Sequence, residues 1–292
     1  MNQRRITGRA CNVRGGIMER FGIVTNGMKD PGRDITERIV QYLKKHGAAW
    51  EVAHAAGDIS SKAECILVLG GDGTMLQAAK ETAGRNIPLL GINLGSLGYL
   101  AEVEIQSLEE ALDKLLAGEY ETEERMMLSG TIHHLNEQIR TSPALNDIAI
   151  TRCGTLQIIK LNIFVNGKFL CQWKADGIIL STPTGSTGYS MSAGGPLVVP
   201  GADLLLLTPI CAHTLNARSI VLKGEDEVEI EVAYGRNGTR LMVEANSDGS
   251  EKFIMETGDR ICIRRAEETI TTIKLSKVSF LEMLHKKLSD EK

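Results

Sequence analysis

The hydrophobic pattern changes its period near residue 125, and this change constrains the fold more than any other feature of the sequence. Before that point, short apolar runs such as residues 65–69 (CILVL) alternate with segments of helical periodicity such as residues 34–47. Short apolar runs separated by helices are typical of parallel strands that are covered on both faces. We therefore predict an α/β domain with an open, mostly parallel sheet over residues 18–124.

Residues 125–276 place apolar side chains at every second position, which indicates strands with one buried face. Asn166-Gly167 predicts a hairpin turn between two of these strands, because both residues tolerate positive φ angles. Asn237-Gly238 and Asp248-Gly249 are further turn signals in the same region. The sequence therefore predicts a mainly β second domain.

The two ends of the chain carry separate expectations. Residues 277–292 are predicted to form a C-terminal helix that packs back on one of the domains, with these apolar residues on one face: Val278, Leu281, Leu284 and Leu288. Residues 1–17 are interpreted as a disordered tail, or as a misassigned start with Met18 as the true first residue. They lack the apolar segment of a secretory signal.

Two shorter segments also carry structural predictions. Ser107 and Glu110 match a capping box at the start of a helix, in which each side chain bonds the other residue's backbone amide. Residues 120–125 (YETEER) predict a solvated, charged connector between the domains, because such runs seldom become ordered.

Composition excludes several classes of protein. The 292 residues are 42% hydrophobic, and 33 basic residues against 37 acidic ones give a net charge of −4. No basic stripe with interleaved aromatics is present, so we expect no nucleic-acid partner. The apolar runs are too short to span a bilayer, so we expect no membrane partner. The six cysteines are scattered without a C-x-x-C pair, which favours free thiols and a cytoplasmic location.

An aspartate stands in the bend between a predicted strand and a predicted helix, in residues 65–80 (CILVLGGDGTMLQAAK). Asp72 would lie at the carboxyl edge of a parallel sheet, where open α/β folds bind their ligands. Glycines allow close backbone approach to a ligand, and helix N-terminal amides favour phosphate. Aspartate is also a good N-cap, so this stretch alone leaves capping and chemistry open. No Walker A or G-x-G-x-x-G motif accompanies it.

A second segment, residues 175–200 (ADGIILSTPTGSTGYSMSAGGPLVVP), concentrates hydroxyl groups between two prolines. Hydroxyls and exposed amides orient sugar and phosphate oxygens. The segment is anchored by an apolar strand and contains rigid prolines, which argues against a flexible Ser/Gly linker. Eight residues supply the hydroxyls: Ser181, Thr182, Thr184, Ser186, Thr187, Tyr189, Ser190 and Ser192.

The two segments together resemble the NAD kinase family. The likeness rests on GGDGT at residues 70–74 and on DG…TPTGSTGYSMSAGGP about a hundred residues later. Residues 93–102 (NLGSLGYLAE) and 145–150 (LNDIAI) fall where the family keeps two further motifs. The resemblance covers roughly residues 20–275. GGDG alone is less specific, because diacylglycerol-type lipid kinases and phosphofructokinases carry similar motifs.

The resemblance implies a fold, an activity and partners. Such enzymes transfer a phosphoryl group from ATP, or in some members from polyphosphate, to the 2′-hydroxyl of the adenosine ribose of NAD, which gives NADP. The family holds its nucleotide between two domains and usually forms dimers or tetramers. Asp72 matches the aspartate that takes the hydroxyl proton. Magnesium would arrive with ATP, because Mg²⁺ favours substrate phosphates over all-protein cages.

The resemblance also assigns nucleotide-binding residues. Asn146 and Asp147 match an Asn-Glu/Asp pair, with aspartate where glutamate is more usual, and Asp176 matches an aspartate near the nicotinamide end. Tyr99 matches an aromatic residue that can stack on adenine, although core packing remains the alternative. Gly188 stands where alanine is usual. The remaining residues assigned to nucleotide binding are Gly71, Gly73, Thr74, Lys174, Thr187, Tyr189 and Ser192.

Two alternative functions remain open at this point, a lipid kinase of related fold and a non-catalytic dinucleotide sensor. A lipid kinase would need an apolar substrate pocket, which the hydroxyl-rich segment disfavours. A sensor would be expected to lose Asp72, which is present. His133-His134 invites a metal site, but neighbouring strand residues point to opposite faces, so we predict an ordinary surface strand and no protein-bound metal.

Overall fold

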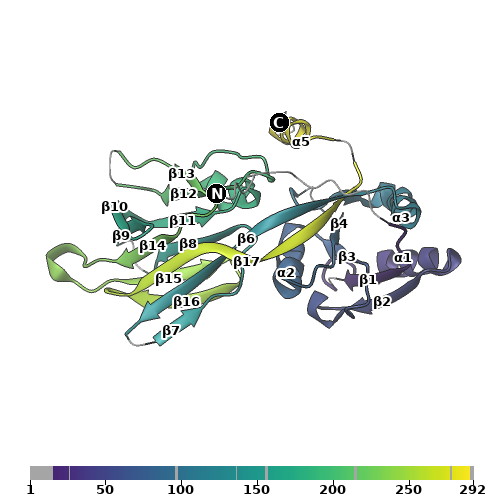
Figure 1. The fold of residues 1–292 in the computed structure, drawn as a ribbon, viewed down its shortest axis with the longest axis horizontal. Coiled ribbons are helices and arrows are strands. Elements are labelled where there is room, and N and C mark those ends of the chain that lie inside the picture. The colour runs from purple at the N-terminus through teal and green to yellow at the C-terminus, as the bar shows by residue number, and fades with distance from the viewer. Residues whose placement is uncertain are drawn as a thin grey trace, which may run out of the picture. The chain divides into compact units, whose positions relative to one another are not determined.

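The computed structural model describes residues 16–25, 27–95, 98–135, 137–154, 157–213, 216–276 and 278–289. The expected tail therefore lies outside the described residues up to residue 15. Met18, the alternative start, is buried. The chain forms two compact units, of which the first contains residues 1–125 and 269–292 and the second residues 126–268 (Figure 1). The domain limits expected from the sequence stay a prediction.

The first unit is built on a parallel sheet, which confirms the predicted α/β class. Its central strands pair in the order β2-β1-β3-β4, all parallel. These strands are β1 (Arg20–Thr25), β2 (Ala49–Ala53), β3 (Cys65–Gly70) and β4 (Leu89–Asn93). The short strand β5 (Val103–Glu104) and Thr272 of β17 (Arg260–Lys274) pair with β4, also in parallel.

The strand order reverses between β1 and β3, and this reversal positions the site. The chain leaves β1 through α1 (Asp34–Lys45) to β2 on one side, then returns to β3 on the other side of β1. In open α/β sheets the ligand crevice lies beyond the carboxyl ends of the strands at such a switch point. Helix α2 (Asp72–Thr82) begins there, directly after β3 (Figure 1).

The helix ends follow the sequence signals with one exception. Helix α3 (Leu108–Ala117) ends at Gly118, which has φ 71°, as glycine permits. The predicted capping box at its start is wrong. Ser107 makes no side-chain capping bond, because a 3₁₀ turn leads into the helix and gives Ser107 φ −101° and ψ 15° rather than an extended conformation. Glu110 pairs with Lys114 at 2.7 Å instead.

Residues 120–125 do not form the expected solvated connector. From Glu121 the segment belongs to β6 (Glu121–His134), and Arg125 is buried with its guanidinium 2.8 Å from the Glu123 carboxylate. Burial lowers the pKa of Arg125, and the nearby Glu123 opposes this effect. The segment is ordered as part of β6, with Glu123 and Arg125 paired, while Glu121 and Glu124 stay exposed.

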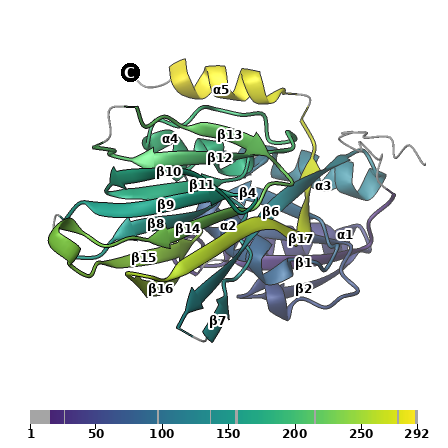
Figure 2. The same cartoon turned by 60° about the vertical axis from the view of Figure 1, so that its left-hand side comes forward.

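The second unit is mainly β, as predicted. One sheet is antiparallel with the order β13-β12-β11-β8-β15-β16 (Figure 2). Its strands are β8 (Asp147–Arg152), β11 (Gly177–Ser181), β12 (Leu204–Ile210), β13 (Ile220–Lys223), β15 (Met242–Ser247) and β16 (Glu251–Glu256). Residues 126–134 of β6 and β7 (Glu137–Arg140) form a further hairpin.

A second layer of strands completes the core of this unit. β9 (Ile159–Val165), β10 (Lys168–Ala175), β14 (Val228–Val232) and the first residues of β17 pair antiparallel. Ile148 and Leu180 from the first layer share one hydrophobic cluster with Leu161 and Ile230 from the second. The predicted hairpin turn is confirmed, since Asn166 and Gly167 both have positive φ.

The C-terminal helix α5 (Phe280–Ser289) is confirmed, but two residues of its expected contact face are exposed, while Leu284 is half-buried. Val278 and Leu281 are exposed, and the Leu288 side chain lies outside the described residues. The helix instead reaches the first unit through Lys287, whose ammonium donates a hydrogen bond to the Gly98 carbonyl.

The cysteines and the helices bear on the remaining expectations. Five cysteines are free thiols, while Cys11 lies outside the described residues. Among the helices of the described ranges, none is long and apolar enough to cross a membrane.

Gly91 in β4 provides a test of how closely residues 98–102 pack on the sheet. A Cβ at this position would lie 2.9 Å from the Ala101 Cα and 3.0 Å from the Met75 sulfur. We expect Gly91→Ala to lower the free energy of unfolding by about 1–3 kcal/mol, measured by urea denaturation. Gly57→Ala is the control, because its Cβ would meet only ordinary contacts. Equal stabilities of the two variants would contradict the close packing.

Candidate active site

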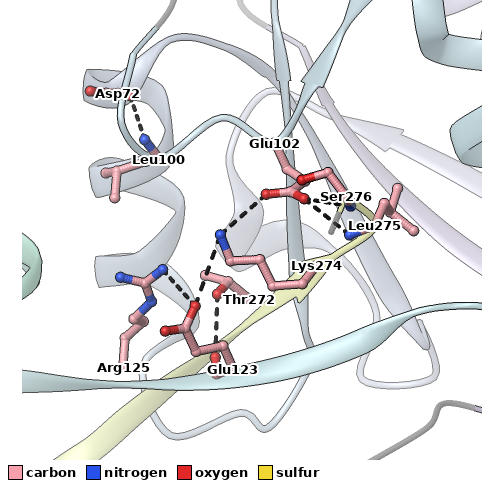
Figure 3. Close-up of polar contacts among 9 residues, drawn as sticks. All are labelled: Asp72, Leu100, Glu102, Glu123, Arg125, Thr272, Lys274, Leu275 and Ser276. Atoms are coloured by element: carbon pink, nitrogen blue, oxygen red, sulfur yellow. Dashed lines mark hydrogen bonds and ion pairs between the residues drawn. The ribbon is translucent and has the colours of Figure 1, made fainter. Parts of the chain in front are cut away.

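Asp72 is the first residue of α2 and faces the loop that follows β4. Its carboxylate accepts a hydrogen bond from the backbone amide of Tyr99 at 2.8 Å. It accepts a second one from the amide of Leu100 at 3.0 Å (Figure 3). Gly71 occupies the N-cap position, and no side chain caps the helix. The capping alternative for Asp72 is therefore wrong, and the carboxylate is held by a separate loop.

Two glycines make room for charged groups at this position. A Cβ on Gly98 would lie 1.9 Å from an oxygen of the Asp72 carboxylate, so only glycine lets the loop pass there. A Cβ on Gly71 would lie 2.9 Å from the Lys29 ammonium. Gly73 is exposed, and the Thr74 hydroxyl lies against Gly70. The bend thus brings one carboxylate and one lysine together at the switch point.

Sequence reasoning missed two lysines near Asp72. Lys29, in the turn after β1, carried no motif signal. Lys287 lies on the predicted C-terminal helix, where only the apolar face was considered. Its ammonium lies 3.4 Å from the centroid of the Tyr99 ring and interacts electrostatically with Asp72. Lys287 therefore covers part of the aromatic ring that the sequence assigned to adenine stacking.

In the second unit, Asn146 and Asp147 lie at the start of β8 and are held by a neighbouring turn. The Asp248 carboxylate accepts hydrogen bonds from three consecutive amides, those of Leu145, Asn146 and Asp147, at 2.7–3.0 Å. The Thr182 hydroxyl donates to the Leu145 carbonyl at 2.6 Å. The sequence identified Asp248 only as a turn residue; its place in an Asp-Gly turn was the one available signal.

The side chains of this pair are incompletely compensated by the surrounding protein. The Asn146 Oδ1 is buried and has no hydrogen-bond partner among the described residues. Burial and the nearby Asp248 carboxylate raise the pKa of Asp147 to about 7. A buried polar atom without a partner is costly, so it indicates a missing ligand or water.

Most hydroxyls of the second segment do not face solvent, which corrects the prediction that they orient a ligand. Ser186 exchanges hydrogen bonds with the backbone of Val198, and Ser190 bonds Thr208. These side chains shape the loop because the buried backbone needs polar partners. The buried members are Ser181, Thr182, Thr184, Ser186 and Ser190.

The remaining residues of the segment line or adjoin a cavity of about 860 Å³ in the second unit. Tyr189 and Ser192 line it, together with His213 and Arg218, which sequence reasoning missed. Thr187 is half-buried beside them in the chain and donates to the Thr184 carbonyl. The only sequence signal for the missed residues was a His and an Arg in a connection between two strands.

Asp176, Asp147 and Tyr189 lie close together in this unit. Burial raises the pKa of the Tyr189 phenol, and the carboxylates of Asp147 and Asp176 add to the shift. Asp176 lies 3.4 Å from Arg152. Lys174 is exposed, and its carbonyl accepts the amide hydrogen of His213.

Gly188 lies beside the Asn146 side chain. A Cβ at this position would be 3.2 Å from the Asn146 Nδ2. This separation is short for a Cβ contact, so an alanine here would press on the amide. The glycine therefore leaves the Asn146 side chain more room than an alanine would.

The two histidines differ in their surroundings. His133 is exposed, as predicted, whereas His134 Nδ1 lies 2.8 Å from the Asp259 carboxylate. This hydrogen bond raises the pKa of His134. Within the part of the chain that the structure describes, no group of three His, Cys, Asp or Glu side chains could hold a metal ion.

Comparisons with known proteins match both units. A family model described as the ATP-NAD kinase N-terminal domain matches residues 51–120, and one described as the ATP-NAD kinase C-terminal domain matches residues 145–275. An NAD kinase of Agathobacter rectalis is 45% identical over 284 residues, which covers 94% of this chain and 99% of the relative. An NAD kinase of Moorella thermoacetica is 40% identical and covers 94% of this chain and 90% of the relative.

Solved structures of the same kind share the fold. An NAD kinase from Archaeoglobus fulgidus, in complex with ATP, has a TM-score of 0.76 at 25% identity, covering 92% of this chain and 99% of that one. A yeast NADH kinase, in complex with NADH, has a TM-score of 0.80 at 21% identity, covering 94% of this chain and 89% of that one. The second likeness concerns the fold alone.

Asp147 should make stability depend on pH. Its pKa rises from 3.8 in the unfolded chain to about 7 in the folded one. The free energy of unfolding therefore falls as pH rises from about 4 to 7, because the unfolded chain releases the Asp147 proton before the folded one does. We expect Asp147→Asn to gain about 2 kcal/mol over the wild type between pH 5 and pH 8, measured by urea unfolding.

Asp226→Asn is the matched control for this experiment. A hydrogen bond from Asn166, together with the Lys223 amide, lowers the pKa of Asp226, so its loss should destabilise the protein instead. A difference between Asp147→Asn and wild type that stays constant from pH 5 to pH 8 would show that Asp147 does not titrate in this range.

Proposed function

The chain belongs to the NAD kinase family, and we propose that it transfers the γ-phosphoryl group of ATP to the 2′-hydroxyl of the adenosine ribose of NAD, which gives NADP. The observation that carries this proposal is the position of Asp72. It is a carboxylate at the switch point of a parallel sheet, beside a helix N-terminus and a lysine. This combination serves proton transfer and phosphate binding together.

Asp72 acts as a general base during transfer. The pKa of an aspartate side chain in water is about 3.9, far below that of a sugar hydroxyl, so such a group does not ionise the alcohol in advance. It orients the 2′-oxygen and accepts the proton as the new P–O bond forms and the bond to the leaving diphosphate breaks. The amides of Tyr99 and Leu100 each bind one carboxylate oxygen, which leaves further lone pairs for the hydroxyl.

The second unit supplies dinucleotide contacts in this proposal. The unpartnered Asn146 oxygen and the Asp147 carboxyl group offer hydrogen bonds to a base amine or to ribose hydroxyls. Arg218 and His213 line the cavity that Tyr189 and Ser192 also line, and a guanidinium suits an anionic group. Asp176, Thr187, Gly188 and Lys174 are proposed to contribute from the same neighbourhood.

Phosphate binding is proposed for the bend of the first unit. The backbone amide of Gly73 belongs to the first turn of α2, where helix amides point outward, whereas the Thr74 amide donates to the Gly71 carbonyl at 3.0 Å. Lys29 adds a positive charge beside Gly71. Polyphosphate is the alternative donor, and NADH the alternative acceptor. An assay of NADP formation with each donor supplied in turn distinguishes ATP from polyphosphate.

Magnesium is proposed to enter with the donor phosphates. The described residues offer no group of three metal-binding side chains, whereas Asp72 is a single carboxylate at the phosphate site. Mg²⁺ commonly keeps several waters and binds through one carboxylate plus phosphates, and it neutralises charge during transfer. A cytoplasmic location and a homodimer or homotetramer are proposed with the family resemblance, and light scattering of the purified protein tests the assembly.

Removing magnesium should abolish turnover at saturating ATP and NAD. We expect EDTA to stop NADP formation, and added Mg²⁺ to restore it in proportion to the MgATP complex rather than to the total metal. The rate is measured with an NADP-specific dehydrogenase at the NADPH absorbance. The proposal would be contradicted if the rate saturated at a low Mg²⁺ concentration that does not depend on ATP, as expected for a tight metal site on the protein.

Asp72→Asn tests the base. The amide keeps the size of the side chain but cannot accept the proton, so we expect kcat to fall by about 10²–10⁴-fold while KM for NAD changes little. Asp34→Asn is the control, because Asp34 is likewise the first residue of a helix, α1, and is exposed. A parallel loss of NAD binding and turnover in Asp72→Asn would contradict the base assignment.

A further inference from the structure

The loop that holds Asp72 is itself held at several points. We call residues 98–102 the strap. Near its start, the amides of Tyr99 and Leu100 bind the Asp72 carboxylate. Near its end, the Glu102 amide donates to the Gly91 carbonyl at 3.0 Å. The strap therefore crosses the end of the sheet in one defined path, and the direction of its two amides sets the orientation of Asp72.

The Glu102 side chain ties the strap to the end of β17. Its carboxylate accepts hydrogen bonds from the amides of Leu275, at 3.1 Å, and Ser276, at 2.9 Å, and lies 3.2 Å from the Lys274 ammonium (Figure 3). Only 6% of this side chain is exposed. A buried carboxylate needs such partners, so the bonds fix the point from which the chain continues toward α5.

Helix α5 brings the chain back to the other end of the strap. Lys287 donates to the Gly98 carbonyl and lies 3.4 Å from the centroid of the Tyr99 ring. Burial lowers the pKa of Lys287, and the nearby Asp72 carboxylate opposes this effect. The Lys287 ammonium thus contacts Gly98 and Tyr99, the two residues joined by the peptide bond whose N–H binds Asp72.

We propose that the C-terminal segment after Lys274 is a brace for the strap. Glu102 holds the start of this segment at Leu275 and Ser276. Lys287 is a positioning residue that holds Gly98 and Tyr99, so that the strap amides orient Asp72. This inference rests on the proposed function of Asp72. It predicts an effect on turnover from a residue far away in the sequence, near the C-terminus. Lys287 binds neither reacting group in this proposal.

The test uses four single variants and one double variant of the full chain. Lys287→Met removes the ammonium but keeps an unbranched side chain, and Lys287→Arg restores a cation. Glu102→Gln removes the anchor charge. Glu64→Gln is the matched control, because Glu64 also accepts two consecutive backbone amides, of Glu19 and Arg20, and pairs with a cation, Arg20. Glu64 lies at the opposite, amino-terminal ends of β1 and β3.

We expect Lys287→Met and Glu102→Gln each to lower kcat about tenfold, with KM for NAD changed less than twofold, because the strap orients the base rather than the dinucleotide. Glu64→Gln should lose less melting temperature than Glu102→Gln, because its side chain is 32% exposed, and should keep kcat. Lys287→Arg should retain most of the turnover. The Glu102→Gln/Lys287→Met double variant should be no slower than the slower single variant, because both act through one brace.

Hydrogen exchange provides a readout that does not depend on activity. The amide hydrogens of Tyr99 and Leu100 should exchange faster in Lys287→Met and in Glu102→Gln than in the wild type. Their exchange rates should be unchanged in Glu64→Gln. Unchanged exchange together with an unchanged kcat would overturn the inference. A higher kcat in Lys287→Met would also overturn it, since the ammonium would then obstruct the site. If wild-type protein forms no NADP, the proposed function fails, while the exchange data still test the brace.

Discussion

Two backbone amides hold the carboxylate on which the rest of the site depends. Asp72 is the first residue of a helix whose N-cap position is taken by Gly71, so its side chain does not cap the helix. The amides of Tyr99 and Leu100 bind it instead. This arrangement has a steric condition, because any side chain on Gly98 would collide with the carboxylate. The loop after β4, the glycines and the switch point of the sheet therefore act together around a single side chain.

The second unit shows the energetic cost of a polar site. Asp147 and Asp248 are two neighbouring carboxyl groups, and burial raises the pKa of Asp147 to about 7. The Asp248 carboxylate accepts hydrogen bonds from three backbone amides, which compensate its negative charge. The Asp147 carboxylate has fewer compensating partners, so its ionised form is unfavourable in the folded protein without a ligand. Such groups are typical of binding sites, where a ligand supplies the missing interactions.

Sequence patterns predicted the architecture well because that architecture depends on local signals. The hydrophobic periodicity, the glycines that end helices and the Asn-Gly turns are all local features, so a short segment of sequence already shows them. The hydroxyl-rich segment was predicted less well. Composition shows that Ser186 and Ser190 carry hydroxyls, but only the fold decides whether these face a ligand or the neighbouring backbone. The burial of Arg125 was not predicted either, because a run of charged residues does not show that this guanidinium lies buried 2.8 Å from the Glu123 carboxylate.

Lys29, Lys287 and Asp248 could not be identified from the sequence as parts of the site. Each acts through proximity to a residue distant in the chain, and the one local signal among them, the Asp248-Gly249 turn, indicates a bend rather than a binding role. Asp72 could be found because its motif is contiguous. The residues that build a site are thus more visible in sequence than the residues that support it.

The first unit is discontinuous in the chain, since residues 269–292 complete a fold that residues 1–125 begin. During synthesis the ribosome delivers the second unit in full before the last strand residues of the first unit emerge. Thr272, which pairs with Leu89, and the amides that satisfy Glu102 therefore arrive last. Until then Leu89 of β4 lacks its partner in β17, although β5 already pairs with Ile92 and Asn93, and the Glu102 carboxylate lacks its two amides. The unit that carries Asp72 is thus the last to become complete, although its sequence begins first.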